Sequence, residues 1–474
     1  MIHHNTKIIA TVGPACSSYQ NLLALAQEGV AIFRINFSHG TYDDHAAVIH
    51  SILQINEKHD AHLGILCDLQ GPKLRIGLIE NNQLEVFPGD ILTFVNESCI
   101  GTKDKIYMSY ENFAEDVKPG ESILIDDGKL VFEVIESNKK DTVKLKCLFG
   151  GILSSNKGVN LPDTEISLPS LTPKDMRDLE FILQHPVNWI ALSFVRKARD
   201  IEELINLIEN AKHSAKVIAK IEKPEAIKNL DAIIKISNGI MIARGDLGVE
   251  FPIEKLPTVQ KMIIAKCIQR ARPVIVATQL MDSMIQNPSP TRAEVTDVAN
   301  AVLDGTDAVM LSAETSVGMH PVKVVKAMNK IIFEAEKHYA IITKRPRPSD
   351  KSSTFISDVV CFNAAKTAED IKAKAIIGLT VSGYTAFKTS SYRPNCPIFI
   401  FSSAIHMLGT LNLVWGVRCY YYDKMSSTDE TIDDLIELLK AEKKLQVGDL
   451  VVNTGSMPIH KKLRTNMLKV TEVE

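Results

Sequence analysis

The segment KVIAKIEKPEAIKNLDAIIKISNGIMIARGDLGVEF, residues 216–251, predicts two buried strands joined by one helix. Its first apolar run leads directly into Lys220 and Glu222. Its second apolar run leads into Gly245 and Asp246. A lysine, two carboxylates and an accessible glycine backbone at neighbouring strand ends suit a divalent metal ion and a phosphorylated anion. The segment therefore predicts a site where such an anion binds.

The same strand-and-helix unit recurs along the chain. Eight such units favour a closed parallel barrel over an open sheet, because an α/β barrel is built from eight strands that alternate with helices. We therefore expect a (β/α)8 TIM barrel, in which all eight strands run in the same direction. The expected strands span residues 7–11, 31–37, 64–68, 189–194, 217–222, 239–243, 273–278 and 308–312.

Polar side chains gather at or just after the carboxyl ends of these strands. In a barrel those ends converge on one face, which is the face that carries the active sites of this fold. A solvated rim is the alternative explanation, but so many polar residues at these positions favour a binding site. The ten residues are Arg34, Asn36, Asp68, Ser193, Lys220, Glu222, Asp246, Thr278, Gln279 and Glu314.

Two regions depart from the alternating pattern and predict further domains. Residues 71–168 lack helical periodicity and alternate short strands with glycine-rich turns, which predicts a small all-β domain inserted into the barrel. The barrel then comprises residues 1–70 and 169–343. A proline- and arginine-containing linker at residues 344–350 precedes a C-terminal α/β domain with an open sheet, residues 351–474.

The composition excludes several classes of protein. A formal net charge of −3 and the absence of a basic stripe argue against a nucleic-acid partner. Eight scattered cysteines without a CxxC pair predict free thiols in a reducing compartment. No apolar run approaches the roughly 20 residues of a membrane helix, and the N-terminus does not resemble a signal peptide. We therefore expect a cytoplasmic protein without a membrane partner.

Six motifs, taken in chain order, resemble those of pyruvate kinase, and the resemblance covers nearly the whole sequence. It implies phosphoryl transfer from phosphoenolpyruvate to ADP, which gives pyruvate and ATP in the final step of glycolysis. It also implies that the inserted β domain closes as a lid and excludes water. The motifs are FRINFSHG (33–40), AKIE (219–222), MIARGDLG (241–248), ATQ (277–279), PTRAE (290–294) and VANAVLDG (298–305).

The resemblance implies roles for the metal ligands and the phosphoryl contacts. Glu222 and Asp246 resemble the two carboxylate ligands of Mg²⁺, with Mn²⁺ as the alternative ion. Lys220 would lie against the transferring phosphoryl group, whose charge is spread over its oxygens. Arg34 would bind the same group, because a planar guanidinium suits phosphate oxygens. A plain ion pair between Lys220 and Glu222 is the alternative, but it would be costly to bury.

The remaining substrate contacts follow from the same resemblance. The backbone N–H groups of Gly245 and Asp246 would hold the substrate carboxylate. Thr278 resembles the residue near the methylene carbon, where it would help a water molecule to protonate the enolate. The residues that resemble the family's nucleotide contacts are Asn36, His39, Arg75 and Lys174. The sequence contains neither a GxxxxGK[ST] nor a GxGxxG loop, so the common nucleotide-binding motifs are absent.

Lys73 distinguishes this chain from many relatives. In many pyruvate kinases a monovalent cation is held by residues that resemble Asn36, Ser38, Asp68 and the carbonyl of Leu69, and a glutamate stands where this chain has Lys73. A tethered ammonium can supply the charge of that ion, so we expect no requirement for K⁺. The alternative is a solvated Lys73 with an intact K⁺ site.

The C-terminal domain contains a candidate effector site. Thr380, Ser382, Gly383 and Thr385 lie where a strand passes into a helix, and hydroxyl and N–H groups there bind phosphate. A plain helix cap is the alternative. The short partner loop, residues 453–458, does not identify the effector. The candidates are fructose 1,6-bisphosphate, a pentose or hexose monophosphate, and AMP.

The resemblance also predicts a homotetramer, with the helix at residues 291–305 at a subunit contact. Two other classes of function stay open at this point. A related Mg²⁺-dependent barrel lyase would need neither Lys220 nor the inserted β domain. A catalytically inactive metabolite sensor would not need to keep Lys220, Glu222, Asp246 and Thr278. Formation of ATP from phosphoenolpyruvate and ADP distinguishes the kinase from both of these classes.

Overall fold

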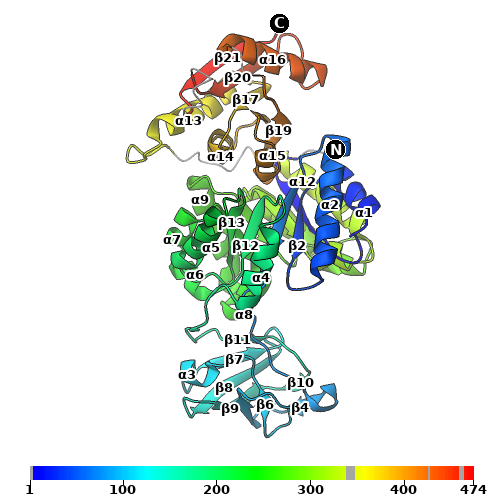
Figure 1. The fold of residues 1–474 in the computed structure, drawn as a ribbon, viewed down its shortest axis with the longest axis vertical. Helices are drawn as coiled ribbons and strands as arrows, with labels where there is room; N and C mark the ends of the chain where they lie inside the picture. The colour runs from blue at the N-terminus through cyan, green and yellow to red at the C-terminus, as the bar shows by residue number, and fades with distance from the viewer. Residues whose placement is uncertain (1–3, 338–346, 425–426, 458–463) are drawn as a thin grey trace.

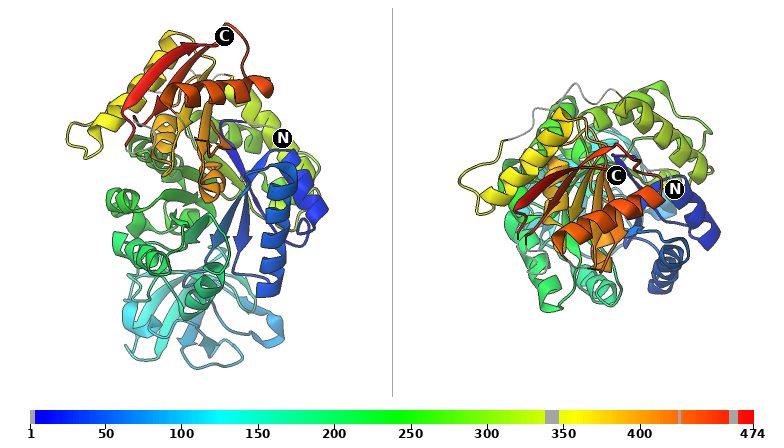
Figure 2. Two further views of the ribbon diagram at one scale, coloured as in Figure 1. Left: turned by 45° about the horizontal axis from the view of Figure 1, so that its top comes forward. Right: turned by 90° about the horizontal axis from the view of Figure 1, so that it is seen from above.

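The structure is a computed structural model that describes residues 4–337, 347–424, 427–457 and 464–474. It contains three domains along one long axis, with the barrel in the middle (Figure 1). The β domain and the C-terminal domain lie at opposite ends of the barrel in both Figures 1 and 2. Part of the predicted linker, residues 344–346, and Pro458 of the predicted effector loop lie outside the described residues.

The predicted parallel barrel is confirmed. Its eight strands form a closed ring in which β1 pairs with both β2 and β16, and each neighbouring pair is parallel. Apolar side chains such as Trp189 and Met241 fill the interior. The strands are β1 (Lys7–Thr11), β2 (Val30–Asn36), β3 (Gly64–Asp68), β12 (Trp189–Leu192), β13 (Lys216–Ile221), β14 (Gly239–Ala243), β15 (Val274–Ala277) and β16 (Ala308–Leu311).

Helices surround the barrel, and several begin at a side chain that caps free backbone N–H groups. Thr41, Thr172 and Thr291 each form such a capping box with an acidic residue three positions later. The helices of this domain are α1 (Tyr19–Gln27), α2 (Tyr42–His59), α4 (Pro173–Ile182), α5 (Ala198–Asn210), α6 (Pro224–Lys228), α7 (Leu230–Ile236), α8 (Arg244–Glu250), η2 (Ile253–Lys255), α9 (Leu256–Gln269), η3 (Asp282–Ile285), α10 (Arg292–Leu303), α11 (Ala313–Ser316) and α12 (Pro321–Glu336).

The prediction of a single helix between β13 and β14 is wrong. The connection contains two short helices, α6 and α7, which meet at Asn229. The Asn229 side chain donates to the carbonyls of Glu225 and Arg196, at 3.1 and 3.0 Å. Asparagine side chains compete with helical hydrogen bonding in this way, so the helix is interrupted there.

The inserted segment forms the predicted all-β domain with a hydrophobic core of its own. A six-stranded sheet has the order β11-β7-β8-β9-β5-β6, and β4 pairs separately with β10. Phe94 and Phe132 are fully buried in this core. The elements are η1 (Glu80–Asn82), β4 (Leu84–Val86), β5 (Ile91–Val95), β6 (Ile106–Tyr107), α3 (Phe113–Asp116), β7 (Ser122–Ile125), β8 (Leu130–Ser137), β9 (Thr142–Phe149), β10 (Gly151–Leu153) and β11 (Val159–Asn160).

The C-terminal domain is the predicted open α/β sheet, with strand order β19-β18-β17-β20-β21. Its last strand is antiparallel to β20, and the others are parallel. Its elements are α13 (Phe355–Asp370), β17 (Ala375–Leu379), α14 (Tyr384–Ser391), β18 (Ile398–Ser402), α15 (Ile405–Leu411), β19 (Val417–Tyr421), α16 (Thr428–Ala441), β20 (Leu450–Gly455) and β21 (Met467–Glu472).

The C-terminal domain closes the amino-terminal end of the barrel. The Trp189 indole N–H donates to the carbonyl of Thr410 at 3.2 Å, and Leu413 joins the apolar cluster inside the barrel. At Gly64, a Cβ atom would lie only 2.6 Å from the Gly409 carbonyl oxygen. The carboxyl ends of the strands therefore face the β domain at the other end.

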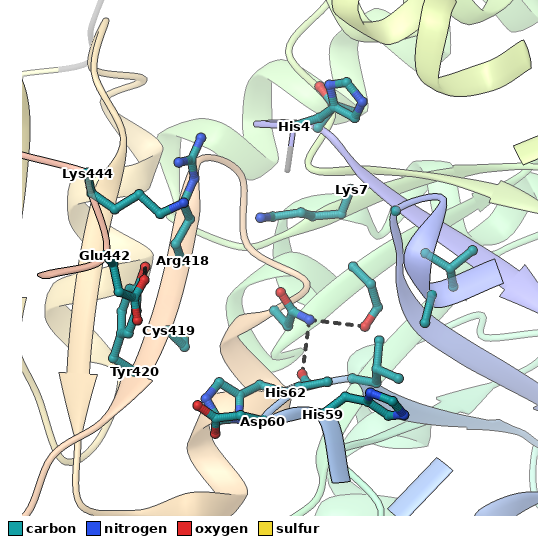
Figure 3. A pocket seen from close by; sticks show the side chains of 18 residues that line it. His4, Lys7, His59, Asp60, His62, Arg418, Cys419, Tyr420, Glu442 and Lys444 are labelled. Atoms are coloured by element: carbon teal, nitrogen blue, oxygen red, sulfur yellow. Dashed lines mark hydrogen bonds between the residues drawn. The ribbon is translucent and has the colours of Figure 1, made fainter. Parts of the chain in front are cut away.

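A cavity of about 230 Å³ remains at this interface (Figure 3). Lys7, His4 and Arg418 are among its lining side chains. The Asn412 amide spans the gap by donating to the carbonyls of Ala31 and His62, at 3.2 and 2.9 Å, as the dashed lines in Figure 3 show.

Within the described ranges, no helix is long and apolar enough to cross a membrane.

Candidate active site

Four charged side chains from β2, β3 and the end of β13 form a continuous network at the carboxyl end of the barrel. Arg34 donates through Nε to Asp68 Oδ2 at 2.7 Å. The Lys220 ammonium lies 3.2 Å from Asp68 Oδ1 and 2.9 Å from Glu222 Oε1. None of these side chains is more than 11% exposed. The prediction that these strand ends converge on one site is therefore confirmed for these four residues.

The network determines which of its groups carry charge. Burial favours a neutral Lys220, but the carboxylates of Asp68 and Glu222 outweigh it and raise the pKa of Lys220 above its ordinary value. Burial also opposes ionisation of Asp68, yet Lys220 and Arg34 hold its pKa below the usual range. The site therefore favours a protonated Lys220 ammonium, which lies beside the Arg34 guanidinium around Asp68.

Glu222 and Asp246 form a donor set that fits a divalent metal ion. Burial raises the pKa of Glu222, and the negative charge of Asp246 raises it further against the opposing effect of Lys220. The two carboxylates are therefore close enough to repel one another, and a cation between them would relieve that repulsion. Among the described residues no cluster of three or more His, Cys, Asp or Glu ligands occurs. Mg²⁺ commonly uses few protein carboxylates together with substrate and water oxygens.

The backbone N–H of Gly245 already has a partner in this structure. It donates to Thr278 Oγ1 at 2.7 Å, and the Thr278 hydroxyl in turn donates to the Ala277 carbonyl at 2.6 Å. Thr278 has a φ of +69° and Gln279 a φ of +53°, which are strained values for residues with side chains. Such strain is common at functional sites, because it holds a side chain in a required position.

Arg244 holds this strained turn in place. Its guanidinium donates to the carbonyl of Thr278 at 2.7 Å and pairs with Asp297 on α10 at 2.8 Å. Sequence reasoning assigned no role to Arg244 or Asp297. The position of Arg244 beside Gly245 was a usable signal, whereas Asp297 lies 53 residues away and gave none.

Three of the predicted nucleotide contacts, Asn36, His39 and Lys174, lie near one another, and Arg75 lies at the β domain. Asn36 accepts from the backbone N–H of Ser38 at 3.1 Å, and His39 is exposed. Lys174 on α4 donates to the Phe37 carbonyl at 2.6 Å, and pairs with an aspartate on the same helix. Arg75 donates to the carbonyl of Asn156, at 2.7 Å, and so lies against the β domain.

Arg34 and Glu222 have further partners that the sequence did not reveal. Thr11, at the end of β1, accepts from Arg34 Nη1 at 2.9 Å. The backbone N–H of Phe194 donates to Glu222 Oε2 at 2.7 Å, and Phe194 has a φ of +54°. The strand-end rule could have found Thr11. The sequence could not indicate the positive φ of Phe194, because phenylalanine does not favour that backbone conformation.

The atoms predicted to hold K⁺ are largely engaged by the protein. Asp68 pairs with two cationic side chains. The Leu69 carbonyl accepts from Ser193 Oγ at 2.7 Å, and that hydroxyl accepts from Lys220 Nζ at 2.7 Å. Lys73 is exposed and lines a small cavity between β domain and barrel together with Asp246. Within the described ranges no carboxylate lies within ion-pair distance of the Lys73 ammonium.

The candidate effector residues surround the start of α14. Thr380 Oγ1 accepts from the Gly383 N–H at 3.0 Å, and Gly383 has a φ of +81°. Thr385 shares a hydrogen bond of 2.6 Å with Thr465. Ser382 is exposed and lines a cavity of about 690 Å³ between the C-terminal domain and the barrel.

Two family models match the chain and together cover most of it. The model described as "Pyruvate kinase, barrel domain" matches residues 3–325. The model described as "Pyruvate kinase, alpha/beta domain" matches residues 358–471. The matched regions correspond to the barrel with its β domain and to the C-terminal sheet.

Individual proteins give the same result over nearly the whole of this chain. Pyruvate kinase of Clostridium acetobutylicum is 40% identical over 473 residues, with 99% of each chain covered. Pyruvate kinase of Geobacillus stearothermophilus is 40% identical over 471 residues, which cover 98% of this chain and 80% of the relative. The crystal structure of a pyruvate kinase from Cryptosporidium parvum superposes with a TM-score of 0.92 at 33% identity, covering 99% of this chain and 96% of that one.

Proposed function

This chain belongs to the pyruvate kinase family, and from that premise we propose how its own residues perform the reaction. It is a phosphotransferase of glycolysis that converts phosphoenolpyruvate and ADP into pyruvate and ATP. One observation carries the proposal: Lys220 contacts both Asp68 and Glu222, so that Arg34, Asp68, Lys220 and Glu222 form one buried network at the mouth of the barrel.

Lys220 and Arg34 bind the transferring phosphoryl group. The transfer passes through a state whose negative charge is spread over the phosphoryl oxygens, so catalysis depends on positioned positive charge. Lys220 keeps its proton because its neighbours raise its pKa. Arg34 is held by Asp68 and Thr11, which leaves its guanidinium fixed rather than free to rotate. Both cations are therefore in place before the substrate arrives.

Members of this family use a divalent metal ion, and we propose Glu222 and Asp246 as its protein ligands. When bound, the ion neutralises negative charge on the substrate oxygens and so favours transfer. Glu222 is oriented by the N–H of Phe194, which fixes one carboxylate oxygen, while Lys220 contacts the other. The same set would accept Mn²⁺, because its ligands are also oxygen atoms. We propose Mg²⁺ as the working ion.

Thr278 and Gly245 serve the organic part of the substrate. The substrate carboxylate binds the backbone N–H groups of Gly245 and Asp246 after the Thr278 hydroxyl releases the first of them. A Cβ atom at position 245 would lie 3.4 Å from Thr278 Oγ1, so a side chain there would crowd the hydroxyl. The released hydroxyl then orients a water molecule that protonates the enolate, since the pKa of threonine is too high for it to act alone.

The nucleotide binds on the side of Asn36, His39, Arg75 and Lys174. Arg75 lies where the chain enters the β domain, and its contact with Asn156 connects it to that domain. Closure of the β domain as a lid would therefore carry Arg75 toward the nucleotide. We propose that the barrel comprises residues 1–70 and 169–343, the β domain residues 71–168, and the C-terminal domain residues 351–474.

Replacement of the central lysine tests the assigned roles. Lys220→Met removes the ammonium at similar length, and we expect ATP formation to fall by at least about a thousandfold, because a positioned charge of this kind contributes several kcal/mol to the transition state. Lys235→Met, an exposed lysine on α7, is the control and should retain wild-type turnover. Unchanged turnover of Lys220→Met would contradict the assigned role.

We propose that the enzyme is active without added K⁺. Support comes from the engaged Asp68 and Leu69 atoms and from the Lys73 ammonium, which forms no ion pair with a carboxylate in the part of the chain that the structure describes. Turnover measured in buffer free of Na⁺ and K⁺ should match turnover with added K⁺, and Lys73→Glu should become dependent on K⁺. A large stimulation of the unmodified enzyme by K⁺ would reject the proposal.

We propose that a phosphorylated effector binds at Thr380, Ser382, Gly383 and Thr385. The cavity that includes Ser382 is also lined by the basic side chains Arg270, Arg272, Arg347 and Lys388, which favours an anion there. Phosphoenolpyruvate saturation curves should respond to at least one member of a panel of sugar phosphates and nucleotides. Ser382→Glu should abolish that response and leave basal turnover intact. A response retained in this variant would contradict the site.

A homotetramer with α10 at a subunit contact is also proposed. Val295 on this helix is 38% exposed in the single chain, which leaves apolar surface available to a neighbour. Light scattering coupled to size-exclusion chromatography gives the subunit number, and a monomer would contradict the proposal. A cytoplasmic location stays a prediction.

A further inference from the structure

One carboxylate joins three segments that surround the active site. Glu250, at the end of α8, accepts from Lys223 Nζ at 2.5 Å and from Asn160 Nδ2 at 2.9 Å, both through Oε1. Lys223 lies at the start of α6, and Asn160 lies on β11 of the β domain. The contact therefore links two parts of the barrel with the inserted domain.

The two barrel segments are those that carry the proposed metal ligands. Lys223 directly follows Glu222, and Glu250 lies four residues after Asp246 on the same helix. Lys223 Nζ also lies 5.8 Å from the centre of the Phe194 ring, and the backbone of Phe194 binds Glu222. The spacing between the two ligand segments thus depends on the Lys223–Glu250 pair.

The Lys223–Glu250 pair is almost completely buried. The Glu250 side chain is 1% exposed and the Lys223 side chain 6%. Glu250 Oε2 is buried without a hydrogen-bond partner among the described residues. A buried ion pair with an unsatisfied oxygen contributes little net stability, since desolvation offsets much of the attraction. The arrangement is thus better explained by what it positions than by stability.

An ionic contact between the β domain and the barrel has a different character. Lys197 pairs with Glu165 at 2.9 Å, but these side chains are 62% and 76% exposed. Exposed pairs of this kind contribute about 0–1 kcal/mol. Neither residue belongs to the segments that carry Glu222 and Asp246, because Lys197 precedes α5 and Glu165 lies in the inserted domain. Glu165 therefore offers a matched control for Glu250.

We propose that Glu250 is a positioning residue for phosphoryl transfer, which sets the spacing between the Glu222 and Asp246 segments and ties that spacing to the β domain through Asn160. The inference rests on the proposed metal ligands. When the β domain is in contact, Asn160 holds Glu250 against Lys223, and the ligand segments are held together. When the β domain moves away, Glu250 loses one of its two partners and the spacing relaxes.

Steady-state kinetics of the full chain tests the proposal, with Mg²⁺, phosphoenolpyruvate and ADP varied in turn. Glu250→Gln keeps the shape and removes the charge, and should raise the apparent KM for Mg²⁺ by about tenfold or more, because small misplacements of reacting groups have effects of this size. Asn160→Ala leaves the ion pair intact and should raise the same KM by a smaller factor, without a change in Tm. Glu165→Gln should leave every constant unchanged.

Coupling between the residues is the discriminating measurement. If Asn160 acts through Glu250, the double variant Asn160→Ala/Glu250→Gln should be no worse than Glu250→Gln alone. Additive effects would overturn the proposal, as would wild-type constants in Glu250→Gln. A loss of Tm with unchanged kinetic constants would show a purely structural role and would also overturn it.

A second variant keeps the test decisive if Glu250→Gln does not fold. Lys223→Met/Glu250→Leu replaces the pair by apolar side chains, which buried sites often tolerate. It should fold and show the same rise in the KM for Mg²⁺, and wild-type constants would overturn the proposal. If Lys220→Met is inactive while the Glu250 variants have wild-type kinetics, this inference alone is contradicted. Active Lys220→Met contradicts the proposed site instead.

Discussion

The two ends of the barrel carry domains that are attached in opposite ways. At the carboxyl end, the exposed pair Lys197–Glu165 and the small buried contact around Glu250 join the β domain to the barrel. At the amino end, the Arg393–Asp307 pair of 3.0 Å is 2% and 3% exposed, and Leu413 enters the barrel interior. The first interface includes polar contacts that water can replace. The second includes a buried ion pair and an apolar side chain inserted into the barrel.

This difference predicts which domain moves. Contacts that water can replace cost little to break, so the β domain can open and close around the substrate. Removing one partner of a buried pair leaves an uncompensated charge, so the C-terminal domain should stay docked. If an effector binds at the proposed site in that domain, its signal should therefore pass through the barrel rather than by detachment of the domain.

The largest effect should follow from breaking the buried pair at the amino end. Arg393→Met leaves Asp307 buried without its cation, and we expect a loss of about 3–5 kcal/mol of stability. Asp307 also accepts from the backbone N–H of Trp415 at 3.1 Å, so the disturbance reaches beyond one contact. Chemical denaturation measures the change.

The matched change at the other end is Lys197→Met. It should alter stability by less than about 1 kcal/mol, because its pair with Glu165 is exposed. Equal losses in the Arg393 and Lys197 variants would remove the contrast between the two ends.

A smaller effect should come from adding a single methyl group at each end. Gly64→Ala would place Cβ 2.3 Å from Ile32 Cδ1 and 2.6 Å from the Gly409 carbonyl oxygen, and such overpacking costs about 1–3 kcal/mol. Gly158→Ala in the β domain would meet nothing within 4 Å. Thermal unfolding should therefore give a lower Tm for Gly64→Ala than for Gly158→Ala. An unchanged Tm in Gly64→Ala would show that the interface around Gly64 is not closely packed.

A further small effect concerns Lys7 in the cavity between the barrel and the C-terminal domain. Its ammonium donates to the Val417 carbonyl at 2.7 Å, and burial lowers its pKa from 10.5 to about 8. Because the folded-state pKa lies below the unfolded one, the folded chain binds fewer protons between about pH 8 and 10.5, and stability rises with pH across this window.

Lys7→Met removes this buried charge. At pH 7 the unmodified chain buries a charged ammonium, which is costly to desolvate. Removing this cost should outweigh the loss of one hydrogen bond, so the variant should be more stable by about 1 kcal/mol. The gain should disappear by pH 10. Unfolding curves at the two pH values measure it, and a gain that does not depend on pH would contradict the explanation.

The sequence was sufficient to predict the barrel and the convergence of several charged residues at one end of it. Lys220, Glu222 and Arg34 could be placed together because parallel strands end on one face. The break at Asn229 was not predicted, because a polar residue inside a helical pattern is usually tolerated. The short strands β6 and β11 give no signal of their own, because two residues are too few for an alternating pattern.

Other features depend on contacts between distant parts of the chain. Arg393 and Asp307 are 86 residues apart and belong to different domains, so no local pattern relates them. The positive φ of Thr278 and Phe194 is imposed by the surrounding structure, since neither residue type favours it. The partners of Glu250 are likewise defined only once the β domain has folded.

The position of the two tryptophans gives the protein an intrinsic optical probe. Trp189 and Trp415 are the only tryptophans in the sequence, and both lie where the C-terminal domain meets the barrel. Trp415 stacks under the Arg393 guanidinium at 5.0 Å. Tryptophan emission from the unmodified chain should therefore follow the docking of that domain and stay silent when the β domain moves.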